Sequence, residues 1–191
     1  VTFSDGSTTE CCGEHLWTVQ SPLNKFRKKP PKIMSLQEIK AKGLAHINGN
    51  LQYFIPMTKP VQFPEREQPL DAYLLGALLG DGSFSSTPVF TNADEELVNQ
   101  VARLLPEGIK LKNKSGYDYR ITTGIRGGSL SSSPNLVTKA LRKMELIGHT
   151  ASGKFIPKNY LYGSVSQREA LLQGLLDTDG YASPGSSTIE Y

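Results

Sequence analysis

Two aspartates, Asp81 and Asp179, are the residues of this sequence whose spacing and surroundings best fit chemistry. Each closes a short apolar segment that ends in Asp-Gly, and the segments 74–82 and 172–180 match at five positions. Their separation of 98 residues indicates two similar half-domains rather than a solenoid. If the segments pack together, the two carboxylates come close, and like charges so placed need a shared proton or cation. Their hard oxygen ligands favour Mg²⁺, with Mn²⁺ as a substitute.

Helices must position these acids. The first segment has apolar residues at helical spacing, which gives one wide apolar face: Leu74, Leu75, Leu78 and Leu79. Small residues stand four apart in each segment, where they would let two helix backbones approach closely: Gly76 and Gly80 in the first, Gly174 and Thr178 in the second. The alternative is a pair of ordinary buried helices with Asp-Gly turns.

Capping residues define the ends of the two predicted helices. Asp71 and Ser166 are the expected N-caps, and Gly82 and Gly180 are the expected stops. The acids then lie in the last turn of each helix, where the helix dipole disfavours a negative charge. Because both predicted helices carry a carboxylate at this unfavourable position, Asp81 and Asp179 are candidates for a functional role.

The paired segments resemble the motifs of LAGLIDADG homing endonucleases, and their context resembles an endonuclease embedded in an intein. The resemblance implies an α+β fold: an αββαββα half-domain, then the start of a second half, in a monomer with two pseudo-symmetric halves. It implies metal-dependent hydrolysis of phosphodiesters in double-stranded DNA. Asp81 and Asp179 would be catalytic metal ligands, and backbone carbonyls at Gly80 and Thr178 would assist them. Mg²⁺ or Mn²⁺ is the implied cofactor.

A further basic residue enters through the same resemblance. The run Lys154-Phe155-Ile156-Pro157 lies shortly before the second segment and resembles an endonuclease block of inteins. Lys154 would be a catalytic cation that stabilises the phosphate or helps to activate water. The alternative is a simple surface lysine.

Charge is unevenly distributed along the chain. The formal net charge is +3, but residues 25–59 carry +7 and residues 103–158 carry +8, separated by an acidic stretch. Two basic blocks indicate a surface for a polyanion. Within the second block, a predicted hairpin over 109–123 and the loop after it supply the candidate DNA-binding residues: Lys110, Lys112, Lys114, Tyr119, Arg120 and Arg126. The alternative is a solvated strand face.

Residues 1–62 are predicted to form a separate, mostly-β partial Hint (splicing) domain, and residues 63–191 the endonuclease domain. The string from Phe3 to Val19 resembles the intein block in which a histidine polarises the scissile amide, so His15 would be catalytic in splicing. Cys12 replaces the threonine of that block. The partners implied are host-protein exteins.

The ends and composition complete the expectations. Val1 is no splicing nucleophile and no His-Asn precedes Tyr191, so this piece is expected not to splice and to cleave DNA poorly or not at all. The adjacent Cys11 and Cys12 cannot build a disulfide framework, and no apolar run is long enough for a membrane span, so an intracellular, cytoplasmic protein without a membrane partner is expected. Alternatives are a non-cleaving nucleic-acid-binding relative, of maturase or regulator type, and a splicing intein with a decayed endonuclease.

Overall fold

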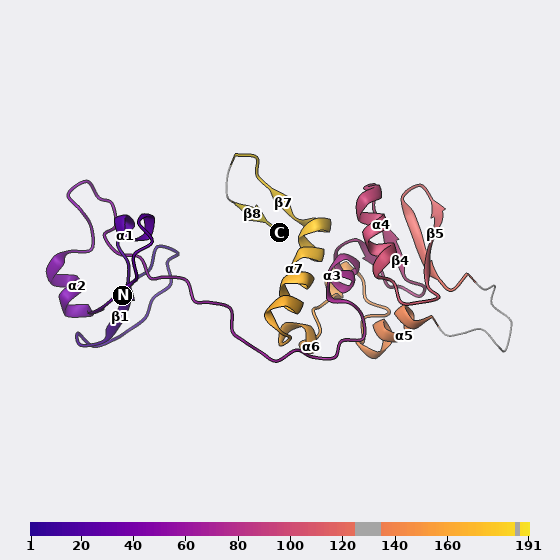
Figure 1. Ribbon diagram of the computed structural model, residues 1–191, viewed down its shortest axis with the longest axis horizontal. Helices are drawn as coiled ribbons and strands as arrows, with labels where there is room; N and C mark the ends of the chain where they lie inside the picture. Colours follow the sequence, from indigo (N-terminus) through magenta and orange to yellow (C-terminus); the bar gives the residue numbers. More distant parts are fainter. Residues whose placement is uncertain (125–134, 186–187) are drawn as a thin grey trace. The chain divides into compact units, whose positions relative to one another are not determined.

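The computed structural model describes residues 1–124, 135–185 and 188–191. The chain divides into two compact units, unit 1 (Val1–Pro60) and unit 2 (Val61–Tyr191) (Figure 1). The secondary structure is mixed α and β, as the sequence predicts.

Unit 1 is built on one short antiparallel pair. Strand β1 (Leu16–Val19) pairs with β2 (Lys32–Ser35), so that Leu16 lies opposite Ser35. Helix α1 (Pro22–Phe26) connects them, and α2 (Leu36–Lys42) follows β2. The core is formed by Val19, Met34 and Ile39.

The prediction of a mostly-β unit is wrong, because helix α1 interrupts the extended segments in addition to α2, whose start at Ser35 with a capping box the sequence predicts. Ser21 caps α1 and proline follows it at the first helical position, where a missing N–H costs nothing. Ser35 and Glu38 form the capping box of α2. Near the end of the unit, Phe54 forms a bridge with Gln20.

Unit 2 follows the predicted order of helix, two strands, helix, two strands, helix. Its elements are α3 (Ala72–Asp81), β3 (Gly82–Ser83), β4 (Val89–Thr91), α4 (Glu95–Leu104), β5 (Lys110–Ser115), β6 (Asp118–Thr122) and α5 (Leu136–Lys143). A 3-10 turn (Ala151–Gly153), α6 (Lys158–Leu161), α7 (Val165–Asp179), β7 (Tyr181–Ala182) and β8 (Ile189–Glu190) come next. The first four strands form an antiparallel sheet in the order β3-β4-β6-β5.

The four-stranded sheet has one covered face and one open face. Phe90 of β4 lies opposite Tyr119 of β6, so their side chains are on the same face of the sheet. Ile121, two residues after Tyr119 on the same strand, is on that face too. Phe90 and Ile121 are fully buried against apolar side chains of α3, α4 and α5. Arg120, one residue out of step, therefore points to the open face.

Helices α3 and α7 lie side by side in unit 2, and α3 lies between α7 and the sheet in Figure 1. A Cβ at Gly76 would stand 3.1 Å from the Cα of Gly174, and a Cβ at Gly174 would stand 3.1 Å from the Cα of Gly76. The two glycines thus face each other at the crossing. This confirms the packing reason predicted for small residues at these positions.

The start of α7 differs from the prediction. Its N-cap is Ser164 rather than Ser166, because Gln167 stands three residues after Ser164 and completes a capping box with it. The first helix begins as expected, with Asp71 accepting from the N–H of Leu74.

The segment 61–70 is tied to α6 and α7 by hydrogen bonds. The side-chain amide of Gln167 exchanges two bonds with the backbone of Arg66, and Arg168 donates to the carbonyl of Val61. The buried hydroxyl of Tyr160 accepts from the N–H of Leu70 at 3.0 Å and donates to its carbonyl at 2.9 Å. This segment therefore belongs to unit 2 and supports the base of α7.

Candidate active site

Asp81 and Asp179 are the last residues of α3 and α7, and Gly82 and Gly180 cap the two helices in extended conformation. Because the helices cross at Gly76 and Gly174, their C-terminal ends come together. A Cβ at Gly80 would stand 3.1 Å from Oδ2 of Asp179. The two carboxyl groups are close enough that the charge of Asp179 raises the pKa of Asp81.

Burial is the main cause of the raised pKa of Asp81, and the charge of Asp179 adds to it. Two neighbours act in the opposite direction. The Nδ2 group of Asn92 donates to Oδ2 of Asp81 at 2.6 Å, and the positive charge of Lys154 also lowers the pKa. Asp81 is thus a half-buried carboxylate, oriented by one amide and sensitive to any added cation.

Lys154 reaches the end of α3. Its Nζ donates to the carbonyls of Leu79 at 2.7 Å, Gly80 at 3.1 Å and Gly82 at 2.6 Å. It also lies 5.1 Å from the ring centre of Phe84. Three bonds use all the protons of an ammonium group, so Lys154 serves as a cationic cap where the helix dipole is negative. Desolvation lowers its pKa, although both aspartates act to raise it.

The residues fit a divalent cation that keeps most of its water. Among residues 1–124, 135–185 and 188–191, no group of three or more His, Cys, Asp or Glu side chains could hold a metal ion. Two carboxylates with waters and substrate phosphates are nevertheless typical ligands of Mg²⁺. The predicted ligand Gly80 has its carbonyl engaged by Lys154, and the Thr178 hydroxyl donates to the carbonyls of Gly174 and Leu175 in its own helix.

The predicted DNA-binding residues fall into separate groups. Lys112 lies opposite Arg120, and Lys110 is two residues from Lys112, so these three share the open face of the sheet. Tyr119 points to the covered face, because it lies opposite Phe90.

The last lysine of β5 does not follow this pattern. Lys114 stands at a register shift between β5 and β6, so the predicted alternation of lysines is interrupted there. Arg126 lies outside the described residues.

His15 belongs to unit 1. Its exposed ring packs edge-on against Trp17, with 5.1 Å between ring centres, and its backbone N–H donates to the carbonyl of Cys12 at 3.2 Å.

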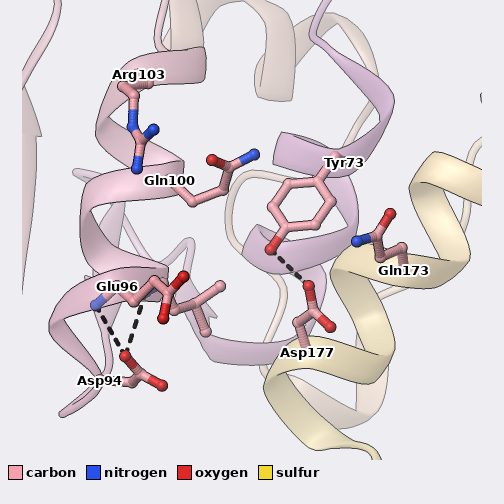
Figure 2. A pocket seen from close by; sticks show the side chains of 8 residues that line it. Tyr73, Asp94, Glu96, Gln100, Arg103, Gln173 and Asp177 are labelled. Atoms are coloured by element: carbon pink, nitrogen blue, oxygen red, sulfur yellow. Dashed lines mark hydrogen bonds between the residues drawn. The ribbon is translucent and has the colours of Figure 1, made fainter.

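Three residues of unit 2 that hold functional side chains or shape a pocket were not predicted from the sequence. The Oδ1 of Asn92 accepts from the N–H of Asp94, while its amide group donates to Asp81. A polar pocket of about 430 Å³ lies between α3, α4 and α7. In it the hydroxyl of Tyr73 donates to Oδ2 of Asp177 at 2.7 Å, as Figure 2 shows. Tyrosine at the start of an apolar helix gave no signal of this bond.

Comparison with known proteins gives one informative similarity. No known family model matches the chain. The chain is 28% identical over 202 aligned residues to the replicative DNA helicase DnaB of Mycobacterium intracellulare. That alignment covers 98% of the chain, which spans only 30% of the helicase. In the part of the chain that the structure describes, no helix has the length and apolar character needed to cross a membrane.

Proposed function

We propose that unit 2 is a metal-dependent DNA endonuclease domain of the LAGLIDADG type and that the chain is part of an intein. The observation that carries the proposal is the meeting of Asp81 and Asp179 at the ends of two helices crossing at facing glycines. The order of elements in unit 2 is the one this family's half-domain requires. The open, basic face of the four-stranded sheet offers a surface for the phosphates of double-stranded DNA.

The chemistry assigned to the site is hydrolysis of a phosphodiester. A bound Mg²⁺ or Mn²⁺ would supply charge neutralisation and an activated water. Asp81 and Asp179 would bind it, and Asn92 would keep the Asp81 carboxylate in one orientation. Lys154 acts on the carboxylates through its electric field, because its protons are used by carbonyls. We therefore assign it a positioning role rather than direct contact with the phosphate.

The helicase similarity fits the intein context. An intein inserted in such a helicase would account for an alignment that covers nearly all of this chain and less than a third of the helicase. In that case the exteins would be the two parts of a DnaB-type helicase, and His15 of unit 1 would act at the upstream splice junction.

An ATPase role taken from the helicase is less well supported. The run Gly148–Lys154 has the spacing of a phosphate-binding loop, but Phe155 replaces its Ser or Thr. Such a loop joins a strand to a helix, whereas this run follows α5 and contains a 3-10 turn. Lys154 is moreover bound to the end of α3.

The test is cleavage of a randomised duplex DNA library with Mg²⁺ or Mn²⁺ by the full-length protein, because this piece alone is expected to cleave DNA poorly or not at all. Wild type should yield cut molecules, and Asp81→Asn should bind DNA without cutting it. Asp177→Asn is the matched control, because this acid lies two residues before Asp179 and bonds to Tyr73. Cleavage by Asp81→Asn at the wild-type rate would refute the assigned metal role.

A second candidate is a DNA-binding relative that does not cut. The engagement of the Gly80 carbonyl by Lys154 favours it, because that carbonyl is one of the expected metal ligands. Binding without cleavage by wild type would select this candidate. In both cases Lys112→Ala should make the salt dependence of DNA binding shallower, by about 0.9 in the slope of log K against log salt.

A further inference from the structure

Unit 1 contains a segment in which all the charged residues are basic. Residues 15–37 include five Lys and Arg and no Asp or Glu. We call the stretch 25–32, which holds all five, the basic turn: Lys25, Arg27, Lys28, Lys29 and Lys32. Each of these side chains is exposed. The dipole of a helix favours cations near its C-terminus. Because α1 has only five residues, its dipole is weak and explains only part of this cluster of cations.

The backbone of the basic turn is fixed. The N–H of Lys29 donates to the carbonyl of Asn24 at 2.9 Å, and the N–H of Lys28 donates to that of Lys25 at 3.1 Å. These two bonds form the Schellman motif that ends many helices. The Nε2 group of Gln20 donates to the carbonyl of Lys29 at 2.6 Å, which fastens the turn to the end of β1.

Lys28 occupies the position in this motif where glycine is favoured. Its φ is 52°, in the left-handed region that L residues with a Cβ rarely adopt. A lysine here costs stability that glycine would not. Backbone strain kept at one position, in a stretch otherwise rich in cations, indicates a use for the side chain.

One aromatic ring accompanies the cations. Phe26 is 85% exposed at the end of α1, between Lys25 and Arg27. The Nζ of Lys25 lies 5.7 Å from the ring centre of Phe54, so the first cation of the turn is held against unit 1. The cations of the basic turn are what recognise a run of phosphates, and the exposed ring adds no contact that a duplex with stacked bases would need.

We propose that the basic turn binds the phosphate backbone of double-stranded DNA, so that unit 1 has a DNA-contacting surface of its own. This proposal rests on the proposed endonuclease function in one respect only, the choice of DNA as the partner. Unit 2 carries a second cationic surface, formed by Lys110, Lys112 and Arg120. A polymer with many phosphates can neutralise cations on more than one surface of a protein, which favours DNA over an anionic membrane.

The decisive variant is Lys28→Gly. It removes one cation and places glycine where the left-handed conformation is needed, so it should raise or preserve the melting temperature of unit 1 while weakening DNA binding. Binding of the full chain to a fluorescent duplex of random sequence is measured over a range of NaCl concentrations. The slope of log K against log salt should become shallower by about 0.9 for each phosphate that the variant no longer neutralises. The matched control is Lys42→Ala, an exposed lysine of α2 in the same unit, which should leave the slope unchanged.

Each outcome decides the proposal. A shallower slope for Lys28→Gly with an unchanged slope for Lys42→Ala supports it, whether or not the library is cleaved. Equal slopes for wild type and Lys28→Gly overturn it. If Lys112→Ala still has its effect in that case, the DNA-binding role of unit 2 stands alone. Loss of binding to phosphatidylserine vesicles in Lys28→Gly, with DNA binding intact, would overturn it in favour of a membrane.

Discussion

Replacement of Gly76 by alanine tests the helix crossing on which the site depends. The new Cβ would stand 2.2 Å from the carbonyl oxygen of Leu171 and 3.0 Å from the N of Leu175. Ordinary contact of a carbon atom begins at roughly 3.5 Å, so the helices must separate by more than about 1 Å. Both neighbours are backbone atoms and cannot rotate away.

The expected loss of stability follows from two opposing effects. Overpacking of a core typically costs about 1–3 kcal/mol, and a backbone clash belongs at the upper end. Alanine gains about 1 kcal/mol over glycine from its better helix propensity. We therefore expect Gly76→Ala to lower the free energy of unfolding of unit 2 by about 2 kcal/mol.

The assay is urea denaturation of the full chain followed by two signals. Far-UV circular dichroism reports mainly the longer helices of unit 2, whereas fluorescence of the single tryptophan, Trp17, reports unit 1. Only the first transition should move. Gln173→Ala, an exposed position beside Gly174, is the control and should change stability by less than about 0.5 kcal/mol. A gain of stability in Gly76→Ala, as propensity alone predicts, would show that the two helices do not cross so closely.

Three further changes have defined outcomes. Because burial raises the pKa of Asp81, the folded state holds its proton to higher pH than the unfolded state, and stability falls as pH rises between the two pKa values. Asp81→Asn should thus be more stable than wild type at neutral pH and lose this advantage in acid, as denaturation at several pH values would reveal. Tyr160→Phe leaves the buried N–H and carbonyl of Leu70 without their partner and should cost roughly 2–4 kcal/mol in urea denaturation; an unchanged midpoint would contradict this. Lys154→Met removes three bonds to the end of α3 and should cost roughly 2–3 kcal/mol in thermal or urea unfolding, whereas a Lys158→Met control should cost little.

The order of elements in unit 2 could be read from the sequence because its signals are local. The spacing of leucines and glycines defined α3 and α7. The N-cap of α7 was misplaced because two serines, Ser164 and Ser166, compete there and only the position of Gln167 decides between them.

The details of the site depended on contacts distant in sequence, which no local pattern contains. The bond from Asn92 to Asp81 joins a strand end to a helix end, and the ammonium of Lys154 crosses to carbonyls 72 to 75 residues away. Strand alternation alone separates Tyr119 from Arg120. Which of the two faces is covered required the register of β6 against β4, which places Tyr119 opposite the buried Phe90. In unit 1, helix α1 was missed because its five residues offer too short a pattern.

The three bonds of Lys154 also make it a reporter of local opening. An amine surrounded by carbonyls and half-buried beside Phe84 reacts slowly with acylating reagents, while the exposed lysines of β5 react at once. Its labelling rate would therefore measure how often the turn after α3 opens in the folded protein. Mass spectrometry of briefly labelled protein could follow that rate, and DNA bound at the carboxylates should slow it further.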